Sequence, residues 1–251
     1  MSITNVGNVY AGDTLNSSTS GYSDPESTPS ATFVYNWFRC STQSSCDTTP
    51  SGTSSTYNTS TADGGKIIKL QVNPVDNLGA VGTAVVTTIF LNNPILFTFS
   101  GIKSNLSVSS LSGWTKCLSE SYNSGSTLTS TLKSNCSKNK ILYSCRLASD
   151  PSNLILAAYG DRASVFNTST ATGNTTVVNN GVGWYYSDSL SIGFAPAAEA
   201  VSRNSCDTND TSQGSLRICW HTSNNNLSSG WRCGGSTGAG DLYVREVFHA
   251  D

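Results

Sequence analysis

Apolar and polar residues alternate in short runs along the whole chain, and this two-residue period is typical of β-strands. In residues 67–72, the side chains of Ile68, Leu70 and Val72 share one face of the predicted strand. The Asp-Asn-Leu-Gly sequence at 76–79 then favours a turn. Further runs rich in aromatic and β-branched residues lie at 33–38 and 84–89.

The second half of the chain continues this pattern, with Ser, Thr, Asn and Gly between the apolar runs. Helical signals are scarce, and only residues 196–201 predict a short helix. Asn92-Asn93-Pro94 favours a turn and interrupts strand pairing, so it marks a boundary between domains at 1–93 and 94–251. The strands predicted after this boundary are 95–99, 154–159, 183–186 and 242–248.

Composition narrows the class of protein. Only 12% of the 251 residues are charged, against about a quarter in ordinary soluble domains, and the formal net charge is -2. Five Trp, ten Tyr and eight Phe carry too much apolar surface for a disordered chain. The absence of a Lys/Arg cluster argues against a nucleic-acid partner. No apolar run approaches the roughly 20 residues of a membrane span, and residues 1–6 do not read as a signal peptide.

The cysteines predict disulfides. Their number is even and no C-x-x-C pair occurs, which favours an oxidising compartment over free thiols or a zinc site. The eight cysteines are Cys40, Cys46, Cys117, Cys136, Cys145, Cys206, Cys219 and Cys233. Cys40 and Cys46 lie close together and far from the rest, so we pair them. The other six allow about 15 connectivities. Of these we expect Cys117–Cys136, Cys206–Cys219 and Cys145–Cys233.

Several short motifs in the first domain carry a family resemblance. They are Gly12-Asp13-Thr14-Leu15, Tyr35-Asn36-Trp37, Ser54-Ser55-Thr56-Tyr57, Ala62-Asp63-Gly64-Gly65-Lys66-Ile67 and Leu70-Gln71-Val72. In this order, residues 3–91 resemble the bacterial immunoglobulin-like repeats of surface proteins, in which a Tyr, an Asp-x-Gly-Lys turn and an alternating strand follow a strand with a core Trp. The resemblance implies a sandwich that serves as a spacer or assembly module without catalytic residues.

The rest of the chain is less closely matched. The segment around Cys40 and Cys46 is longer than in the immunoglobulin-like repeats and bears cysteines. The second domain resembles C-terminal modules of uncharacterised bacterial surface proteins through Gly113-Trp114-Thr115-Lys116-Cys117, Cys219-Trp220-His221-Thr222 and Gly230-Trp231-Arg232-Cys233-Gly234. We therefore predict an all-β chain: an N-terminal immunoglobulin-like β-sandwich and a C-terminal disulfide-rich β-sandwich or jelly-roll-like domain.

Residues with catalytic or metal-binding chemistry are present, but none lies in a recognisable motif. His221 could act as a catalytic base only beside an activated serine, and the sequence has no G-x-S-x-G motif to supply one. Packing beside Cys219 and Trp220 is therefore the simpler interpretation. Asp24-Pro25-Glu26 and Asp207-Thr208-Asn209-Asp210 lack EF-hand spacing and read as turns. Candidate glycosidase carboxylates are Glu120, Asp161, Asp188, Glu199 and Asp241. We expect no enzyme activity, no metal and no cofactor.

Two features connect the chain to carbohydrate. Trp184, Tyr185 and Tyr186, with Asp188 nearby, could form a sugar-stacking surface, although large aromatic rings also dominate cores. Asn-x-Ser/Thr sequons are frequent, and glycans on them would make the chain a glycoprotein and account for its low charge. The acceptors are Asn16, Asn58, Asn105, Asn167, Asn174, Asn209 and Asn226, with a further sequon at Asn135 that the adjoining Cys136 would hinder.

These observations predict an extracellular or cell-surface protein. The first hypothesis is a structural subunit of a filament, a pilus-like fibre or an adhesive assembly, which self-associates through its β-structure. The alternative is a secreted carbohydrate-binding, lectin-like module with glycans as partners. Exposure of the aromatic cluster at 184–186 distinguishes the two, because only exposed rings can stack on a sugar.

Overall fold

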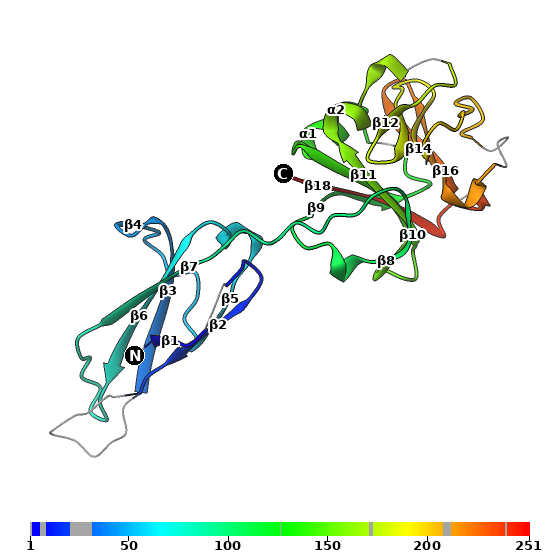
Figure 1. The fold of residues 1–251 in the computed structure, drawn as a ribbon. Helices are drawn as coiled ribbons and strands as arrows, with labels where there is room; N and C mark the ends of the chain where they lie inside the picture. The colour runs from blue at the N-terminus through cyan, green and yellow to red at the C-terminus, as the bar shows by residue number, and fades with distance from the viewer. Residues whose placement is uncertain are drawn as a thin grey trace. The chain divides into compact units, whose positions relative to one another are not determined.

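The computed structural model describes residues 2–5, 9–20, 32–125, 127–170, 173–207, 212–238 and 240–251. The chain forms two compact units, Met1–Ile95 and Leu96–Asp251 (Figure 1). Strands make up 48% of the structure and helices 10%, so the prediction of an all-β fold is confirmed. Within the described ranges, no helix has both the length and the apolar character needed to cross a membrane.

The first unit consists of two antiparallel sheets. One has the strand order β1-β2-β5 and the other β4-β3-β6-β7. Its elements are β1 (Ser2–Ile3), β2 (Thr14–Ser18), β3 (Thr32–Thr42), β4 (Ser45–Cys46), β5 (Thr56–Asn58), the 3-10 helix η1 (Thr61–Asp63), β6 (Ile67–Val75) and β7 (Val85–Phe90). Figure 1 shows β3, β6 and β7 side by side in one layer.

The core of the first unit follows the predicted alternation. Ile68, Leu70 and Val72 on β6 are all fully buried on one face. Trp37 on β3 is also fully buried, and its ring stacks on that of Tyr57 with 5.6 Å between centroids. The indole N–H of Trp37 donates to the Ser54 carbonyl at 2.8 Å, so the buried polar atom is satisfied.

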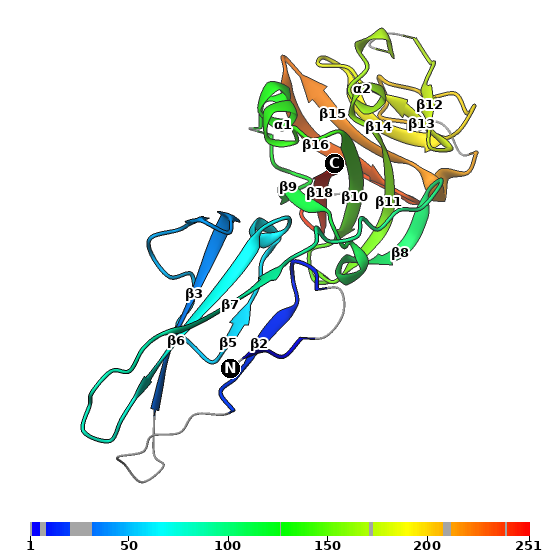
Figure 2. The same cartoon turned by 60° about the vertical axis from the view of Figure 1, so that its left-hand side comes forward.

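The second unit also has two sheets, of five and six strands (Figure 2). The five-stranded sheet has the order β8 (Lys103–Ser107), β11 (Asn153–Asp161), β10 (Lys140–Leu147), β18 (Tyr243–Ala250) and β9 (Thr115–Ser121). The six-stranded sheet has the order β12 (Val177–Asn179), β13 (Val182–Tyr185), β14 (Ser191–Pro196), β15 (Ile218–Ser223), β16 (Asn226–Cys233) and β17 (Ser236–Thr237). The helices are α1 (Thr129–Asn135), α2 (Arg162–Val165), η2 (Val108–Ser110), η3 (Thr168–Thr170) and η4 (Gly214–Leu216).

Aromatic side chains from both sheets form the main core of the second unit. Tyr143 on β10 contacts Trp184 on β13 and Trp220 on β15, with ring centroids 5.7 and 4.8 Å apart. All three rings are fully buried. A second apolar cluster includes Leu142 and Phe248, against which the segment at 96–99 packs. The five-stranded sheet therefore contributes side chains to both clusters.

All eight cysteines are paired in the structure. The pairs are Cys40–Cys46, Cys117–Cys136, Cys145–Cys233 and Cys206–Cys219, so all four expected disulfides are confirmed. Cys145 lies on β10 and Cys233 on β16, so their bond joins the two sheets of the second unit. Cys40–Cys46 closes the short hairpin between β3 and β4.

Two predicted elements are wrong. Residues 95–99 form no strand, because Phe97 and Phe99 cover the apolar cluster around Leu142 instead of joining a sheet. Residues 196–201 end β14 and continue into a turn rather than a helix, and Ala198 there has a φ of 67°. Arg217 binds the Ala200 carbonyl at 2.9 Å, which is an alternative to a helical hydrogen bond.

The Asp-Gly turn of the first unit is organised around the buried carboxylate of Asp63. Asp63 is fully buried and accepts hydrogen bonds from Arg39 Nε at 2.6 Å, from the Ser60 backbone N–H at 2.6 Å and from Tyr57 Oη at 3.2 Å. Burial alone would raise the pKa of Asp63, but the hydrogen bonds from Arg39 and Ser60 outweigh it and lower the pKa. The carboxylate thus ties η1 to β3 and β5.

Replacing Asp63 by Asn should lower the free energy of unfolding of the first unit by about 2–3 kcal/mol, the range for hydrogen bonds to a charged group. Because the folded pKa lies below the usual 3.8, this stabilisation is complete above that pH and is lost as the pH falls through the folded pKa. Urea unfolding at several pH values measures it. The exposed Asp47→Asn is the control, and equal effects of the two variants at neutral pH would contradict the role of Asp63.

Candidate functional site

The aromatic cluster predicted to stack on sugars is part of the core. Trp184 and Tyr186 are fully buried and Tyr185 is 1% exposed, so none offers a ring face to a ligand. Asp188 accepts a hydrogen bond from Tyr186 Oη and lies 3.8 Å from Lys133 Nζ. The assignment of the three rings to sugar stacking is therefore wrong, and Asp188 has no exposed aromatic ring from 184–186 beside it. Strand β13 is buried along its whole length, a property that the run of large residues did not reveal.

His221 is half-buried on β15 and interacts with groups that fix its position. Its Nδ1 lies 3.4 Å from the Leu190 carbonyl, and its ring is 5.9 Å from that of Trp231. Trp231 is 39% exposed, so part of its ring reaches the surface. These contacts supply no nucleophile to the imidazole, and the packing interpretation is the one we retain for His221.

The five candidate glycosidase carboxylates all bind neighbouring side chains. The pairs are Glu120 with Arg245, Asp161 with Lys140, Asp188 with Tyr186, Glu199 with Arg217, and Asp241 with Ser121. Each carboxylate has a different partner on a different element. These side chains therefore support the fold locally.

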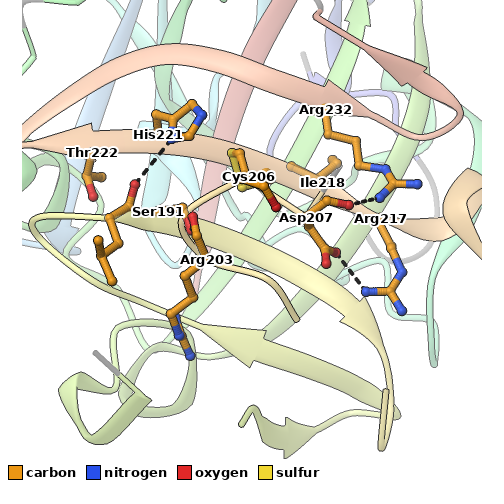
Figure 3. Close-up of a disulfide and its surroundings, with 12 residues drawn as sticks. Ser191, Arg203, Cys206, Asp207, Arg217, Ile218, His221, Thr222 and Arg232 are labelled. Atoms are coloured by element: carbon orange, nitrogen blue, oxygen red, sulfur yellow. Dashed lines mark hydrogen bonds and ion pairs between the residues drawn. A yellow bond between two sulfur atoms is a disulfide. The ribbon is translucent and has the colours of Figure 1, made fainter. Parts of the chain in front are cut away.

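A group of buried charged side chains lies around the Cys206–Cys219 disulfide (Figure 3). Arg217 is fully buried and binds Asp207 Oδ2 at 2.7 Å and Glu199 Oε2 at 3.2 Å. Arg232 donates to the Asp207 carbonyl oxygen. Figure 3 shows dashed lines that join Asp207 to both Arg217 and Arg232. We call Arg203, Asp207, Arg217 and Arg232 the arginine cluster.

Arg203 extends away from the other two arginines toward a different loop (Figure 3). It donates to the carbonyls of Gly173 and Thr175, each at 2.7 Å, and its guanidinium lies 5.1 Å from the Tyr185 ring centroid. Burial lowers the pKa of Arg203. Cys206 and Asp207 both have positive φ, an uncommon conformation for these residue types. The cluster and the disulfide thus hold an irregular loop in place.

The sequence had assigned Asp207 to a calcium-binding or turn-forming segment. Its carboxylate is paired with Arg217, which leaves a turn-forming role as the interpretation the geometry favours. Asn209 and Asp210 of the same segment, and Asp24, Pro25 and Glu26, lie outside the described residues. Within the described part of the chain, no group of three or more His, Cys, Asp or Glu side chains could hold a metal ion.

A different kind of surface lies on the first unit. The face of the four-stranded sheet that points away from Ile68 and Leu70 carries exposed apolar side chains. Val34, Val86 and Phe90 are 49%, 51% and 54% exposed. They occupy this face because successive residues of a strand point to opposite sides of the sheet, while the alternate positions fill the core.

The strand register places these side chains in neighbouring rows. The rows across β3, β6 and β7 are Cys40, Ile67 and Phe90; Phe38, Lys69 and Thr88; and Asn36, Gln71 and Val86. Phe38 and Ile67 are half-buried. We call Val34, Phe38, Ile67, Val86 and Phe90 the outer apolar face.

Very little charge accompanies the outer apolar face. The three long strands carry only two charged residues, Arg39 and Lys69. Arg39 is engaged by the buried Asp63, and Lys69 Nζ lies 4.7 Å from the centroid of the Phe38 ring. The face therefore combines exposed apolar groups with neutral Thr, Asn and Gln and a single charge, that of Lys69, as protein interaction surfaces do.

Comparison with known proteins adds no family. No protein-family model matches the sequence, and neither characterised proteins nor solved structures give a match. The resemblance of residues 3–91 to bacterial immunoglobulin-like repeats stays a prediction that rests on its motifs. We therefore infer function from the geometry alone.

The predicted glycosylation acceptors lie mostly at the surface. Asn16, Asn58, Asn105 and Asn174 are exposed, whereas Asn167 and Asn226 are half-buried. Asn209 lies outside the described residues. The hindered sequon at Asn135 is exposed as well, next to the buried Cys136. Exposure makes the first four the acceptors that a glycosylating enzyme can reach.

The sequence interpretation missed both the outer apolar face and the arginine cluster. The face could have been found, because the alternation of 85–90 places Val86 and Phe90 opposite the core-facing Ile89. The cluster could not, because Arg203, Arg217 and Arg232 lie on separate segments that the fold brings to one loop.

Proposed function

We propose that the chain is a non-enzymatic structural subunit of an extracellular filament or cell-surface adhesive assembly. Support comes from its two β-units, its four disulfides and its low charge, since disulfides persist in oxidising compartments. The observation that carries the proposal is the outer apolar face, which leaves Phe90 and Val86 more than half exposed.

The occupant of this face is a second copy of the chain. Two such faces match in chemistry, because apolar side chains lie among neutral Thr, Asn and Gln on both. A net charge of -2 leaves little electrostatic repulsion between copies. A contact between two identical faces forms a closed dimer. A filament therefore requires a second contact surface, and we expect the dimer to form first as the concentration rises.

Replacing Phe90 by Ser should shift the equilibrium from pairs to single chains, because it removes the most exposed ring of the outer apolar face. Sedimentation velocity of the oxidised protein over a concentration series measures the shift, and we expect the dissociation constant to rise about tenfold or more. Leu78→Ser is the matched control, since Leu78 is 89% exposed in a turn away from this face. Equal sedimentation of the two variants at every concentration would rule out the face as the contact.

The lectin-like alternative loses its proposed aromatic residues, since the rings at 184–186 are buried. A role in carbohydrate binding therefore needs another surface.

A further inference from the structure

A pocket of about 300 Å³ lies beside the edge strand β8 of the second unit. Its lining residues are Asn105, Leu147, Asp150, Asn153 and Ile155. They come from the middle of β8, the end of β10, the following turn and the start of β11. None of them belongs to the outer apolar face or to the arginine cluster, so the pocket is independent of the proposed assembly contact.

Asn105 adopts an uncommon backbone conformation at this pocket. Its φ is 54°, although it lies in the middle of a strand. The β8–β11 ladder includes Leu106 with Leu154 and Ser104 with Leu156, but Asn105 and Ile155 between them are not paired. Asn tolerates this left-handed region better than most residues, and such local strain is concentrated at functional sites.

Asp150 is oriented by its own turn. Its Oδ1 accepts hydrogen bonds from the backbone N–H and the hydroxyl of Ser152, at 3.1 and 2.6 Å, and its Oδ2 accepts one from Asn153 Nδ2 at 3.1 Å. These bonds, led by the Ser152 hydroxyl, lower the pKa of Asp150 and keep the carboxylate ionised at neutral pH. Three of the roughly four acceptor sites of the carboxylate are thus used, and the remaining one, on Oδ2, is left for a further donor.

The lining combines two kinds of chemistry. Asp150 accepts hydrogen bonds, the amides of Asn105 and Asn153 both donate and accept, and Leu147 and Ile155 present apolar groups. A sugar ring has the matching surface, with hydroxyl groups at its rim and C–H groups on its faces. A divalent cation is a poorer match, because hard cations favour several carboxylates and the pocket has one.

We propose that this pocket binds a saccharide. The sugar hydroxyls donate to Asp150 and exchange hydrogen bonds with Asn105 and Asn153, while Leu147 and Ile155 contact its C–H face. The saccharide can come from another molecule or from the chain itself, because Asn105 is an exposed sequon acceptor followed by Leu106 and Ser107. A glycan on Asn105 would begin at the rim of the same pocket.

The test is an NMR titration of the full, oxidised, non-glycosylated chain labelled with 15N. The probes are glucose, galactose, mannose and N-acetylglucosamine, each raised to 50 mM. We expect at least one sugar to shift amide signals within 103–107 and 147–155, with the same shifts in the presence of a chelator. Shifts confined to the Trp231 indole, or shifts that a chelator abolishes, would overturn the assignment of the pocket to a saccharide.

Two variants remove the polar contacts without disturbing the core. Asp150→Ala removes the acceptor, and Asn105→Gly removes the amide while accommodating the positive φ. Each should weaken the binding of the responding sugar by about tenfold or more, as expected for the loss of a well-placed hydrogen bond. The matched controls are Asp241→Ala and Asn224→Gly, which change an exposed Asp and a left-handed Asn outside the pocket. Equal affinities for the pocket variants and their controls would contradict the proposal.

A second arm identifies the source of the saccharide. If free sugars cause no shifts, the proposal requires the chain's own glycan to occupy the pocket in protein made by a glycosylating host. Mass spectrometry should then find Asn105 modified, and Ser107→Ala, which destroys the sequon, should lower the melting temperature in that host alone. Asp150→Ala should abolish this difference. Saccharide binding by either route would be refuted if free sugars shifted no amide signals and Ser107→Ala left the melting temperature unchanged in the glycosylating host.

Discussion

Replacing both Cys145 and Cys233 by Ala should lower the free energy of unfolding of the second unit by about 4–5 kcal/mol. This disulfide closes a loop with a sequence separation of 88, the longest of the four, and it joins β10 in one sheet to β16 in the other. Its removal frees the unfolded chain and also removes two buried sulfur atoms from the aromatic core. Both effects act against the folded state.

Differential scanning calorimetry measures this loss as a fall in melting temperature of about 10–15 °C for a unit of this size. The matched control is Cys40→Ala with Cys46→Ala, which opens a loop with a separation of only 6. That change should cost about 2 kcal/mol and affect the first unit. Equal falls in melting temperature for the two double variants would contradict the larger contribution of Cys145–Cys233. So would a destabilised first unit in the variant that lacks Cys145 and Cys233.

Replacing Arg217 by Leu should destabilise the second unit by about 3–5 kcal/mol, the range for breaking a buried ion pair. Arg217 is fully buried and donates to Asp207, Glu199 and the carbonyls of Ser212 and Ala200. Leu fills much of the space but leaves the buried Asp207 without its partner. The loss therefore comes from an uncompensated charge rather than from a cavity.

Urea unfolding followed by circular dichroism measures the effect of Arg217→Leu. Adding Asp207→Asn should recover part of the loss, because it removes the unpaired charge and because Asn accepts the positive φ of 61° at this position. The two residues would act independently if the losses of unfolding free energy from Arg217→Leu and Asp207→Asn simply added up in the double variant. That result would contradict the ion pair in the structure.

Much of the fold could be predicted because it depends on local patterns. The alternation in 67–72 correctly placed Ile68, Leu70 and Val72 in the core, since a strand has only two faces. Sequence separation predicted the Cys40–Cys46 disulfide, whereas Cys145–Cys233, with a separation of 88, was expected only as the remaining pair. The same kind of reasoning was wrong for residues 95–99. An apolar run can cover a sheet as well as join one, and only the tertiary contacts of Phe97 and Phe99 decide between them.

The candidate sites depended on information that no local pattern contains. Trp184 and Tyr186 lie in a run that could be a ligand platform or a core strand, and burial against the opposite sheet decided for the core. The pocket beside β8 depends on the positive φ of Asn105 and on a turn 45 positions later at Asp150. The outer apolar face was predictable in part, because the period of β7 already separates Phe90 from Ile89.

The proposed assembly through the outer apolar face is tested most directly by the mass of the native, oxidised chain. Multi-angle light scattering over a wide concentration range, with negative-stain microscopy of the most concentrated sample, measures it. We predict a mass that rises with concentration to at least twice the 26.4 kDa of a single chain. A mass that stays at 26.4 kDa at every concentration, with no assemblies in the micrographs, would contradict the proposed assembly.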